Sequence, residues 1–370
     1  MHIARNVHNI SMDVYSFPPS NDFESVEVLK RLVQAHRYLA ELKGLALSIP
    51  NEGILIDTLT LQEAKDSSEV ENIVTTHDEL FKAGAGDLSG TPAAKEVRDY
   101  SAAIKLGFSK VRETGLLRLN DILKMQAIIK RNNAGLRRLP GTTLKNANTS
   151  EVVYEPPQNP GDIERLMGEL VEYINASADN GLDPLIRMAL MHHQFESIHP
   201  FYDGNGRVGR ILNILYLVMH QLLDIPILYL SRHITSNKNE YYRLLQLVRD
   251  SRSWDEWVIY MLDGIENTAK ETINLVKEIK ILMMSAKRRI RAEAPKIYSQ
   301  DMLNNLFRHP YTKIAYLMEE VGVTRVTATK YLEELVKKGV LNKQKFGRDN
   351  YYINVELCEV LIKSSAKHEL

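Results

Sequence analysis

The order of apolar and polar residues along the chain is predominantly helical. Between Val28 and Leu42, apolar residues recur at spacings of three and four, which predicts an amphipathic helix that ends at Gly44. Apolar positions from Ile265 to Met283 predict one long helix that leads into the basic run 287–289. The same periodicity predicts further helices over residues 58–80, 93–107, 118–132, 163–178, 183–193 and 208–222. The fold class is therefore predicted to be mainly α.

A β-prone stretch interrupts the helices near the middle of the chain. Pro140–Leu144 and Val152–Tyr154 favour strands and Asn146–Ser150 favours a turn, so we predict a small β-hairpin that ends at Pro156. A lone hairpin in a helical protein needs a surface to lie against, and the alternative is a simple surface decoration. Glycine and proline residues between Ala83 and Pro92 predict a separate loop.

The C-terminal segment, residues 295–358, has the pattern of a winged helix-turn-helix domain. Three short helices, the third capped by Thr324 and running to Lys338, precede a two-stranded wing over 343–352 with its tip at 346–348. Pro295 to Val355 contains ten Lys and Arg against six Asp and Glu. The presumed recognition helix carries Arg325, Thr327, Thr329 and Lys330. The pattern favours DNA binding or partner docking. The alternative is a dimerisation or packing module with solvated basic residues.

Composition and charge narrow the class of protein. A chain of 370 residues is longer than one core usually supports, so we expect two or three domains. Hydrophobic residues make up 44% and charged residues 25%, which is typical of a globular rather than a disordered chain. Lys and Arg number 47, as do Asp and Glu, so bulk charge does not predict a polyanion-binding protein.

Targeting features favour a cytoplasmic protein without a membrane partner. The longest apolar run, Ile211–Met219, is far too short to span a bilayer, and the N-terminus lacks the apolar segment of a secretory signal. Without such a signal, the retrieval-like tail Lys367–Leu370 is interpreted as a chance match. The single cysteine, Cys358, fits a reducing compartment.

The twelve residues from His199 to Arg210 contain the strongest candidate for an anion site. Gly204 and Gly206 allow positive φ and leave the backbone bare, so that several N–H groups can converge on one anion. A helix predicted to begin near Arg207 directs its positive dipole end to the same point. Arg207 and Arg210 are three residues apart, lie on one helical face, and offer two guanidinium groups for phosphate.

A base and a metal-binding carboxylate accompany this anion site. His199 titrates near neutrality and can accept a proton from an attacking hydroxyl. Asp203 is an oxygen ligand suited to Mg²⁺ that bridges phosphates, and Pro200 and Phe201 are expected to stiffen and pack the loop. Together these residues predict a phosphoryl- or nucleotidyl-transfer site. The alternative is a Gly-rich turn with a hydrogen-bonded histidine and solvated arginines, which would not require these residue types together.

His199–Arg210 also resembles a known motif. It fills every fixed position of the Fic motif, His-Pro-Phe-x-(Asp/Glu)-Gly-Asn-Gly-Arg-x-x-Arg. The resemblance covers about residues 58–268 and implies a Fic-fold helical core over 101–285, behind an N-terminal region, 1–100, with an inhibitory helix at about 58–80. It implies a protein adenylyltransferase that transfers AMP from ATP, with Mg²⁺, to a Tyr, Thr or Ser hydroxyl of a target protein or of itself.

The resemblance implies a role for each residue of the motif. His199 is the base that deprotonates the target hydroxyl, and Asp203 holds Mg²⁺. The α-phosphate is oriented by Asn205 together with the amides of Gly204 and Gly206, while Arg207 and Arg210 hold the β- and γ-phosphates. The remaining members of the implied nucleotide-binding set are Val208, Gly209, Val152, Val153, Tyr154 and, on the adenine side, Tyr241. For Tyr241 the alternative is ordinary helix packing.

The hairpin near Glu151–Tyr154 resembles the flap of the family, which pairs with a target segment by strand addition and covers the nucleotide. Target proteins are therefore expected to dock there. Exposed apolar positions elsewhere would permit a homodimer.

Residues Ser67 to Asn72 fit the inhibitory pattern of the family, Ser/Thr-x-x-x-Glu-(Gly/Asn). Ser67 and Glu71 are four apart, so both are expected on one face of a helix. In relatives with this pattern the glutamate pairs with the second arginine of the motif, here Arg210. The resemblance thus implies that Glu71 occupies the guanidinium that would otherwise bind the γ-phosphate, and that the enzyme is autoinhibited.

Two other functions stay open from the sequence. One is an ATP-sensing, DNA-binding regulator in which the Fic core only detects ATP through Glu71 and Arg210. The other is a Fic enzyme that uses a different nucleotide or reverses AMP transfer. An intact His199 argues against a pure sensor, since nucleotide sensing has no need of a base.

Overall fold

The computed structural model describes residues 17–20, 23–85, 91–145, 149–176, 181–346 and 349–366. Parts of several predicted features lie outside these ranges: the N-terminal residues 1–16, loop residues 86–90, hairpin residues 146–148, the wing tip at 347–348 and the tail 367–370.

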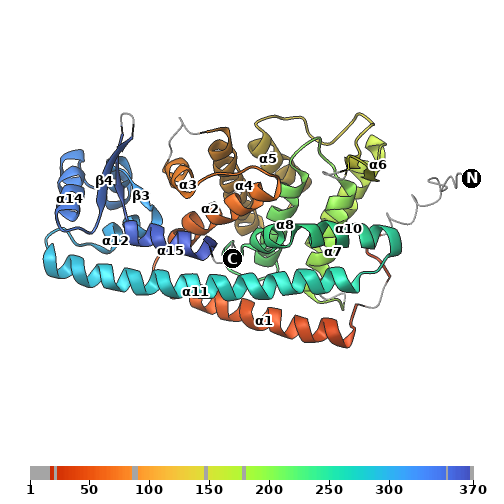
Figure 1. Ribbon diagram of the computed structural model, residues 1–370, viewed down its shortest axis with the longest axis horizontal. Coiled ribbons are helices and arrows are strands. Elements are labelled where there is room, and N and C mark those ends of the chain that lie inside the picture. The colour runs from red at the N-terminus through yellow and green to blue at the C-terminus, as the bar shows by residue number, and fades with distance from the viewer. Residues whose placement is uncertain are drawn as a thin grey trace, which may run out of the picture. The chain divides into compact units, whose positions relative to one another are not determined.

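The described chain is mainly α-helical, as predicted (Figure 1). The helices are α1 (Val26–Ala46), α2 (Glu52–Val70), α3 (His77–Gly84), α4 (Pro92–Thr114), α5 (Leu119–Lys130), α6 (Pro160–Asn175), α7 (Pro184–Ile198), α8 (Asn205–Met219), α9 (Leu230–Ser236), α10 (Lys238–Ser251), α11 (Asp255–Glu293), α12 (Gln300–Arg308), α13 (Ile314–Val321), α14 (Arg325–Lys337) and α15 (Val355–Ala366). The strands are β1 (Leu144–Lys145), β2 (Val152–Tyr154), β3 (Tyr311–Thr312), β4 (Asn342–Phe346) and β5 (Asp349–Ile353).

The chain divides into two compact units. The first comprises Met1–His36, Ala103–Leu222 and Asn237–Ile265, and the second comprises Arg37–Ala102, Leu223–Ser236 and Glu266–Leu370. The elements that lie wholly in the first unit are α5 to α8, α10, β1 and β2.

The first unit is built around α7 and α8. Every residue of α7 from Leu185 to Ile198 is buried, and α6 and α8 pack directly against it. The helix begins where the Asp183 carboxylate accepts a hydrogen bond from the amide of Leu185, with Pro184 at the first helical position. Gln194, Glu196 and Ser197 are polar and yet buried, so the apolar pattern stops at His193 although the helix continues for five more residues to Ile198.

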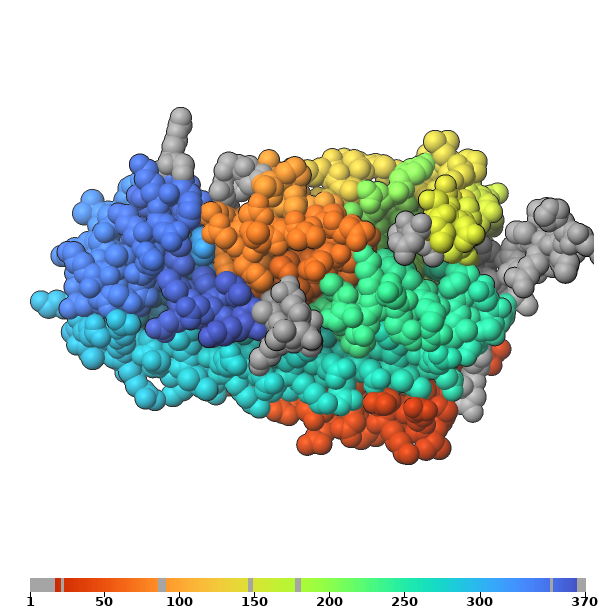
Figure 2. Space-filling view, in the orientation of Figure 1, coloured from red at the N-terminus to blue at the C-terminus, as the bar shows by residue number. Residues whose placement is uncertain are grey.

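The second unit contains a C-terminal group of elements packed on α2 and α3. The expected two-stranded wing is formed by β4 and β5, and α12, α13 and α14 precede it, which is the chain order expected of a winged helix-turn-helix. β3, between α12 and α13, was not expected and adds a third strand, which gives an antiparallel sheet in the order β3-β5-β4. Thr324 caps α14, since its side chain accepts from the amide of Thr327, and Gly322 ends α13 at φ 70°. Figure 2 shows the surface of these elements, in blue, adjoining that of α2 and α3, in orange.

Specific polar contacts hold this C-terminal group on α2 and α3. The Arg308 guanidinium pairs with Asp57 of α2, and the Tyr311 hydroxyl donates to the Asp78 carboxylate of α3 at 2.9 Å. The Lys82 ammonium group lies 3.6 Å from the ring centroid of Phe346 in β4. Helix α2, whose C-terminal end carries the predicted inhibitory pattern, is therefore in direct contact with the C-terminal elements, as is α3.

The single helix predicted over 58–80 is wrong. The chain forms α2 and α3 instead, because Asn72 adopts a left-handed backbone at φ 62° that a helix cannot continue through. A new helix then starts at a capping box in which the Thr76 hydroxyl accepts from the amide of Glu79 and the Glu79 carboxylate accepts from the amide of Thr76. The apolar spacing had continued across the break and concealed it.

Candidate functional site

His199 lies at the junction between α7 and the motif loop. It is the C-cap of α7 and has a left-handed backbone, φ 47° and ψ 58°, which turns the chain sharply toward α8. The side chain of Asn205 then closes the loop with two hydrogen bonds to the backbone of Phe201. Its Oδ1 accepts from the Phe201 amide and its Nδ2 donates to the Phe201 carbonyl, both at 2.8 Å. Phe201 itself is fully buried, as predicted for an anchor of the loop.

His199 differs from the two other histidines near the end of α7. Burial lowers the pKa of His192 to about 3, with a further contribution from Arg210, and burial lowers the pKa of His193 to about 3 as well, with Arg249 adding to it. Both imidazoles are therefore neutral near pH 7 and too weakly basic for proton transfer. Because His199 is only partly buried, it is the histidine of this segment that solvent and substrates can reach.

The first turn of α8 is where the sequence predicts an anion site, and its backbone differs from that prediction in two ways. Gly204 is the N-cap at φ 88°, as expected of a glycine in this turn, and a β-carbon there would approach the Lys130 side chain to 3.3 Å. The helix begins at Asn205, two residues before the predicted start. Gly206 is consequently a first-turn residue and not a positive-φ position, so its unbonded first-turn amide is the group that it can offer to an anion. No acidic residue occupies this turn, which leaves its dipole available to an anion.

The two arginines of the motif are buried and not solvated. Arg207 is 2% exposed and Arg210 is 1% exposed. Buried guanidinium groups require polar partners, and Nη2 of Arg207 lies 3.3 Å from the Asp203 carboxylate. This finding removes the alternative in which the motif is only a Gly-rich turn with arginines in water.

Asp203 is an ionised carboxylate at the open side of the loop. Its side chain is 61% exposed, and Nζ of Lys130 lies 2.6 Å from one of its oxygens. Partial burial raises the pKa of Asp203, but the hydrogen bond and charge of Lys130, together with the charge of Arg207, outweigh it, so the pKa lies below its usual range. The backbone carbonyl of Asp203 accepts from the Gln126 side chain at 3.3 Å.

Val208 and Gly209, both expected to contact nucleotide, face the helix core. Val208 is fully buried. A β-carbon on Gly209 would lie 2.6 Å from Oε1 of Glu196 and 3.0 Å from the Phe195 ring, so a larger residue there would force these side chains of α7 to shift. The structure thus gives both residues a packing role that keeps the two ends of the motif together.

Gly209→Ala is expected to lower the free energy of unfolding by about 1–3 kcal/mol, as overpacking of a tight core contact does. Thermal and urea unfolding would measure it. Gly168→Ala in α6 is the matched control, because no atom lies within 4 Å of its added methyl group. It should stabilise the protein by roughly 0.5–1 kcal/mol through helix propensity. Equal effects of both variants would contradict the tight contact.

The hairpin is confirmed, and it is attached next to His199. β1 and β2 pair antiparallel with Leu144 opposite Tyr154. The Tyr154 hydroxyl donates to the Ser197 carbonyl at 3.0 Å, and the Arg249 guanidinium lies 4.0 Å from the centroid of the Tyr154 ring. Val152 and Val153 remain 55% and 42% exposed. The hairpin is therefore more than a surface decoration, since one strand is fixed to the end of α7 while its valines face solvent.

Tyr241, which matches an adenine-side position, has the contacts of a core residue. It is 1% exposed, and its hydroxyl is 2.9 Å from Nε2 of His192. Its ring packs near Trp257, whose indole donates to the Ala189 carbonyl. These are the contacts of the alternative that the sequence left open, helix packing.

The inhibitory pattern forms the C-terminal end of α2. The amide of Asn72 donates to the carbonyl of Glu69 and that of Ile73 to the carbonyl of Ser68, which is the Schellman arrangement. Since Asn72 has positive φ, the preference for Gly or Asn after the glutamate is explained by backbone conformation. Ser67 is fully buried, and Glu71 is the C-cap. Glu71 belongs to the second unit and Arg210 to the first, and their pairing stays a prediction.

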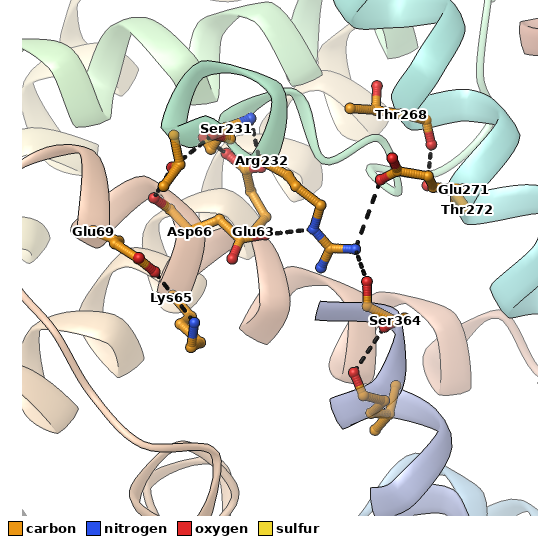
Figure 3. Close-up of polar contacts among 12 residues, drawn as sticks. Glu63, Lys65, Asp66, Glu69, Ser231, Arg232, Thr268, Glu271, Thr272 and Ser364 are labelled. Atoms are coloured by element: carbon orange, nitrogen blue, oxygen red, sulfur yellow. Dashed lines mark hydrogen bonds and ion pairs between the residues drawn. The ribbon is translucent and has the colours of Figure 1, made fainter. Parts of the chain in front are cut away.

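A buried ionic network anchors α2 within the second unit (Figure 3). Nε of Arg232 in α9 lies 3.1 Å from the Asp66 carboxylate, and its Nη1 donates to the Ser364 carbonyl of α15 at 2.8 Å and lies 3.8 Å from Glu271 of α11. Burial raises the pKa of Asp66, although the charges of Arg232 and Lys65 oppose this. The residue next to Ser67 is thus connected to both α11 and α15 by one guanidinium.

Arg232→Met is expected to lower the free energy of unfolding by about 3–5 kcal/mol, because it leaves Asp66 charged and buried without its partner. The double variant Arg232→Met with Asp66→Leu should recover most of that loss, since it removes both charges. A double-mutant cycle from urea unfolding measures the coupling. Additive losses would show that the two side chains do not interact.

Four residues around the motif were not found from the sequence. Lys130 and Gln126 of α5 contact Asp203, Arg249 of α10 contacts the flap strand, and Arg137 contacts the backbone of His199. None stands in a motif, because each reaches the site through tertiary folding from a distant part of the chain. Only their types, basic or amide side chains in helical or loop segments, are visible in the sequence.

The described residues contain neither a membrane-spanning helix nor a cluster of metal-binding side chains. None of the helices in that part of the chain combines the length and apolarity needed to cross a membrane. Among the same residues, His, Cys, Asp and Glu side chains do not gather in groups of three or more that could hold a metal ion. Asp203 offers one exposed carboxylate, which is the type of oxygen ligand that Mg²⁺ prefers.

Comparison with known families agrees with the geometry of the motif loop. The family model of the Fic/DOC family matches residues 116–217, and that of the Fic/DOC family N-terminal region matches residues 29–109. The chain belongs to the Fic/DOC family. A third model, "Protein adenylyltransferase SoFic-like, C-terminal domain", matches residues 282–357, so the Fic/DOC core is followed by a C-terminal domain of this type.

Curated relatives are similar to part of this chain. Protein adenylyltransferase Fic of Drosophila grimshawi is 32% identical over 96 residues, which are 25% of this chain and 18% of the relative. The protein of the same name from Drosophila ananassae is 27% identical over 193 residues, 45% of this chain and 37% of the relative. The chain therefore spans well under half of the length of these relatives.

The fold of Fic/DOC proteins is confirmed by two solved structures. A Fic family protein from Desulfovibrio desulfuricans gives a TM-score of 0.57 at 18% identity, covering 91% of this chain and 98% of that chain. A Fic domain containing signaling protein from Bacteroides thetaiotaomicron gives a TM-score of 0.54 at 19% identity, covering 66% of this chain and 95% of that chain.

Proposed function

We propose that this protein is an adenylyltransferase that transfers AMP from ATP to a hydroxyl side chain of a protein. The observation that carries the proposal is the arrangement of the motif loop. The partly exposed His199 at the end of α7 and the anion-binding first turn of α8, with two buried arginines, are held on one loop closed by Asn205. The names of the Drosophila relatives support the same activity.

In this reaction the target oxygen attacks the α-phosphorus, and the bond from that phosphorus to the β-bridging oxygen breaks. His199 accepts the proton of the hydroxyl, and pyrophosphate leaves. The amides of Asn205 and Gly206 and the dipole of α8 bind the α-phosphate. Arg207 and Arg210 hold the β- and γ-phosphates, so that their two guanidinium groups stabilise the negative charge on the departing pyrophosphate.

Asp203 would hold the Mg²⁺ ion implied by the family, because its carboxylate is exposed, ionised and beside the phosphate site. When bound, the ion would supply charge neutralisation of the phosphates. Lys130 is the side chain that holds the same carboxylate in place.

The target segment is proposed to dock along β2. A strand added to the exposed edge near Glu151 would place its side chains against Val152 and Val153, both exposed, while Tyr154 stays fixed to α7. A Tyr, Thr or Ser hydroxyl is thereby presented near His199. Self-modification is included in this proposal, since any copy can offer such a segment.

Autoinhibition by Glu71 is proposed on the conformation of its segment. The end of α2 is fixed by the Schellman arrangement, by buried Ser67 and by the Arg232 network, so Glu71 is presented by a rigid helix end. A carboxylate presented in this way can form a bidentate pair with Arg210 and exclude the γ-phosphate.

The C-terminal domain is proposed as a docking module for a protein or DNA partner. Arg325 and Lys330 of α14 are exposed, which is the position of a recognition helix. Glu333 on the same helix pairs with Lys343 of the wing at 2.5 Å, so part of the basic charge is neutralised. Binding to duplex DNA that weakens steeply with salt would support DNA as the partner. No binding at low salt would favour protein docking, and a concentration-dependent mass would favour homodimerisation.

Mass spectrometry tests the proposed activity. The protein is incubated with ATP and Mg²⁺, alone and with a cell extract. Addition of one AMP mass to a tyrosine, threonine or serine would support it. A different nucleotide fragment would support the alternative donor, and loss of AMP from a modified protein would support the reverse reaction. DNA binding that responds to ATP, with no transfer, would favour the sensor.

A further inference from the structure

We propose that Arg137 is a positioning residue for His199, a role that rests on the proposed function of the motif loop. Arg137 lies between α5 and β1, outside every sequence motif, and is 0% exposed. Its side chain and backbone bind consecutive carbonyl groups on both sides of the His199 α-carbon.

The contacts of Arg137 enclose one short segment. Its Nε donates to the His199 carbonyl at 2.7 Å, and one Nη donates to the Ile198 carbonyl at 3.3 Å. Its backbone amide donates to the Pro200 carbonyl at 2.8 Å. One residue therefore fixes three carbonyls in a row, with His199 at the centre.

This segment needs such support. A residue with a β-carbon in the left-handed region is disfavoured by roughly 1–2 kcal/mol relative to the right-handed one. His199 occupies that region at φ 47°. The direction of its imidazole follows from this backbone conformation, so the carbonyl contacts determine where the base points. Arginine suits the position because its planar guanidinium offers five donors and no acceptor.

The same guanidinium reaches the flap. The Nη that binds Ile198 also donates to the Pro157 carbonyl at 2.9 Å, three residues after β2 ends. Arg137 thus connects the base to the strand on which the target hydroxyl is proposed to dock. Neighbouring carbonyls of α7 are bound as well, since the Ser197 carbonyl accepts from Tyr154 of the flap and the Glu196 carbonyl accepts from Arg249 of α10.

The geometry predicts a specific kinetic effect. Loss of the Arg137 guanidinium contacts should move the imidazole of His199 relative to the target oxygen. Misplacement by about 1 Å costs on the order of 100-fold in rate. The phosphate site is formed by α8 and its own arginines, so ATP binding should be unaffected. A residue that only supports the fold would weaken both properties together.

The test compares Arg137→Lys with the parent protein. Each is made with and without Glu71→Gly as a second substitution in the same chain. We expect kcat to fall roughly 10- to 100-fold, with the calorimetric Kd for ATP changed by less than about twofold. Arg137→Ala should regain part of its rate in millimolar guanidinium, which can occupy the vacated position. Arg165→Lys, an exposed arginine paired with Glu169 on α6, is the matched control and should leave both values unchanged.

A readout without turnover separates this inference from the proposed function. The imidazole carbon and nitrogen chemical shifts of His199, assigned with His199→Gln, should change in Arg137→Lys and not in Arg165→Lys. Transfer by the parent with an unchanged kcat and unchanged shifts in Arg137→Lys would overturn the positioning role alone. Unfolding of both Arg137 variants would also overturn it, in favour of a structural role. A folded, ATP-binding parent that transfers no AMP would overturn the proposed function, while altered shifts would still show that Arg137 orients His199.

Discussion

His199→Ala will abolish AMP transfer without weakening ATP binding. The imidazole acts on the hydroxyl, whereas ATP is bound by the first turn of α8 and by the buried Arg207 and Arg210. Removal of a general base costs about 10²–10⁴-fold in rate. Initial rates with labelled ATP measure the first property and calorimetry measures the second.

A matched variant, His199→Gln, keeps a polar side chain at the same backbone position but cannot accept the proton. It should lose as much activity as the alanine variant. If the glutamine variant retains near-normal transfer, His199 is not the base. If either variant loses its affinity for ATP, the imidazole belongs to the nucleotide site and the role assigned to it is wrong.

Glu71→Gly is expected to raise transfer by about 10- to 100-fold. A hydrogen bond to a charged group contributes about 1.5–3 kcal/mol, and release of Arg210 to the γ-phosphate would restore one. The variant should fold, because Glu71 is a C-cap and the helix end is fixed by Asn72 and Ile73 through backbone bonds. Initial rates of both forms at saturating ATP measure the effect.

Glu69→Gly is the control for this prediction. Glu69 lies two residues earlier on the same helix end and pairs with Lys65 at 3.2 Å, so its loss removes a charge and weakens the helix without releasing Arg210. It should not raise transfer. An equal increase in both variants would indicate that loosening of α2 is responsible, and no increase in Glu71→Gly would remove the inhibitory role of Glu71.

Local features were predictable because their causes are local. The motif loop, the Thr324 cap and the hairpin each depend on residues close together in the chain, and each is present. The motif itself is the extreme case, since the proposed anion site depends on the backbone of Gly204 to Arg207 alone. Helix α7 was found but ended too early, because its last residues include polar side chains that only the tertiary fold buries.

The features that were missed depend on tertiary contacts. Arg137 reaches His199 across 62 residues of chain, and Lys130 reaches Asp203 from α5. The break between α2 and α3 depends on one left-handed Asn72 within a continuous apolar pattern. Helix α15 was also not predicted, although it contributes the carbonyl that Arg232 binds. The residues themselves are visible in the sequence, but which distant residues they contact is not.

The most direct measurement is to follow both ends of ATP in one experiment. The Glu71→Gly protein is incubated with Mg²⁺ and ATP labelled on either the α- or the γ-phosphorus, beside the same protein with His199→Ala. Adenylyl transfer predicts that the α-label becomes bound to the Glu71→Gly protein and that the γ-label is released as pyrophosphate. The protein that carries both Glu71→Gly and His199→Ala should retain neither label. Retention of the γ-label on the protein, or α-labelling that persists without His199, would contradict the account.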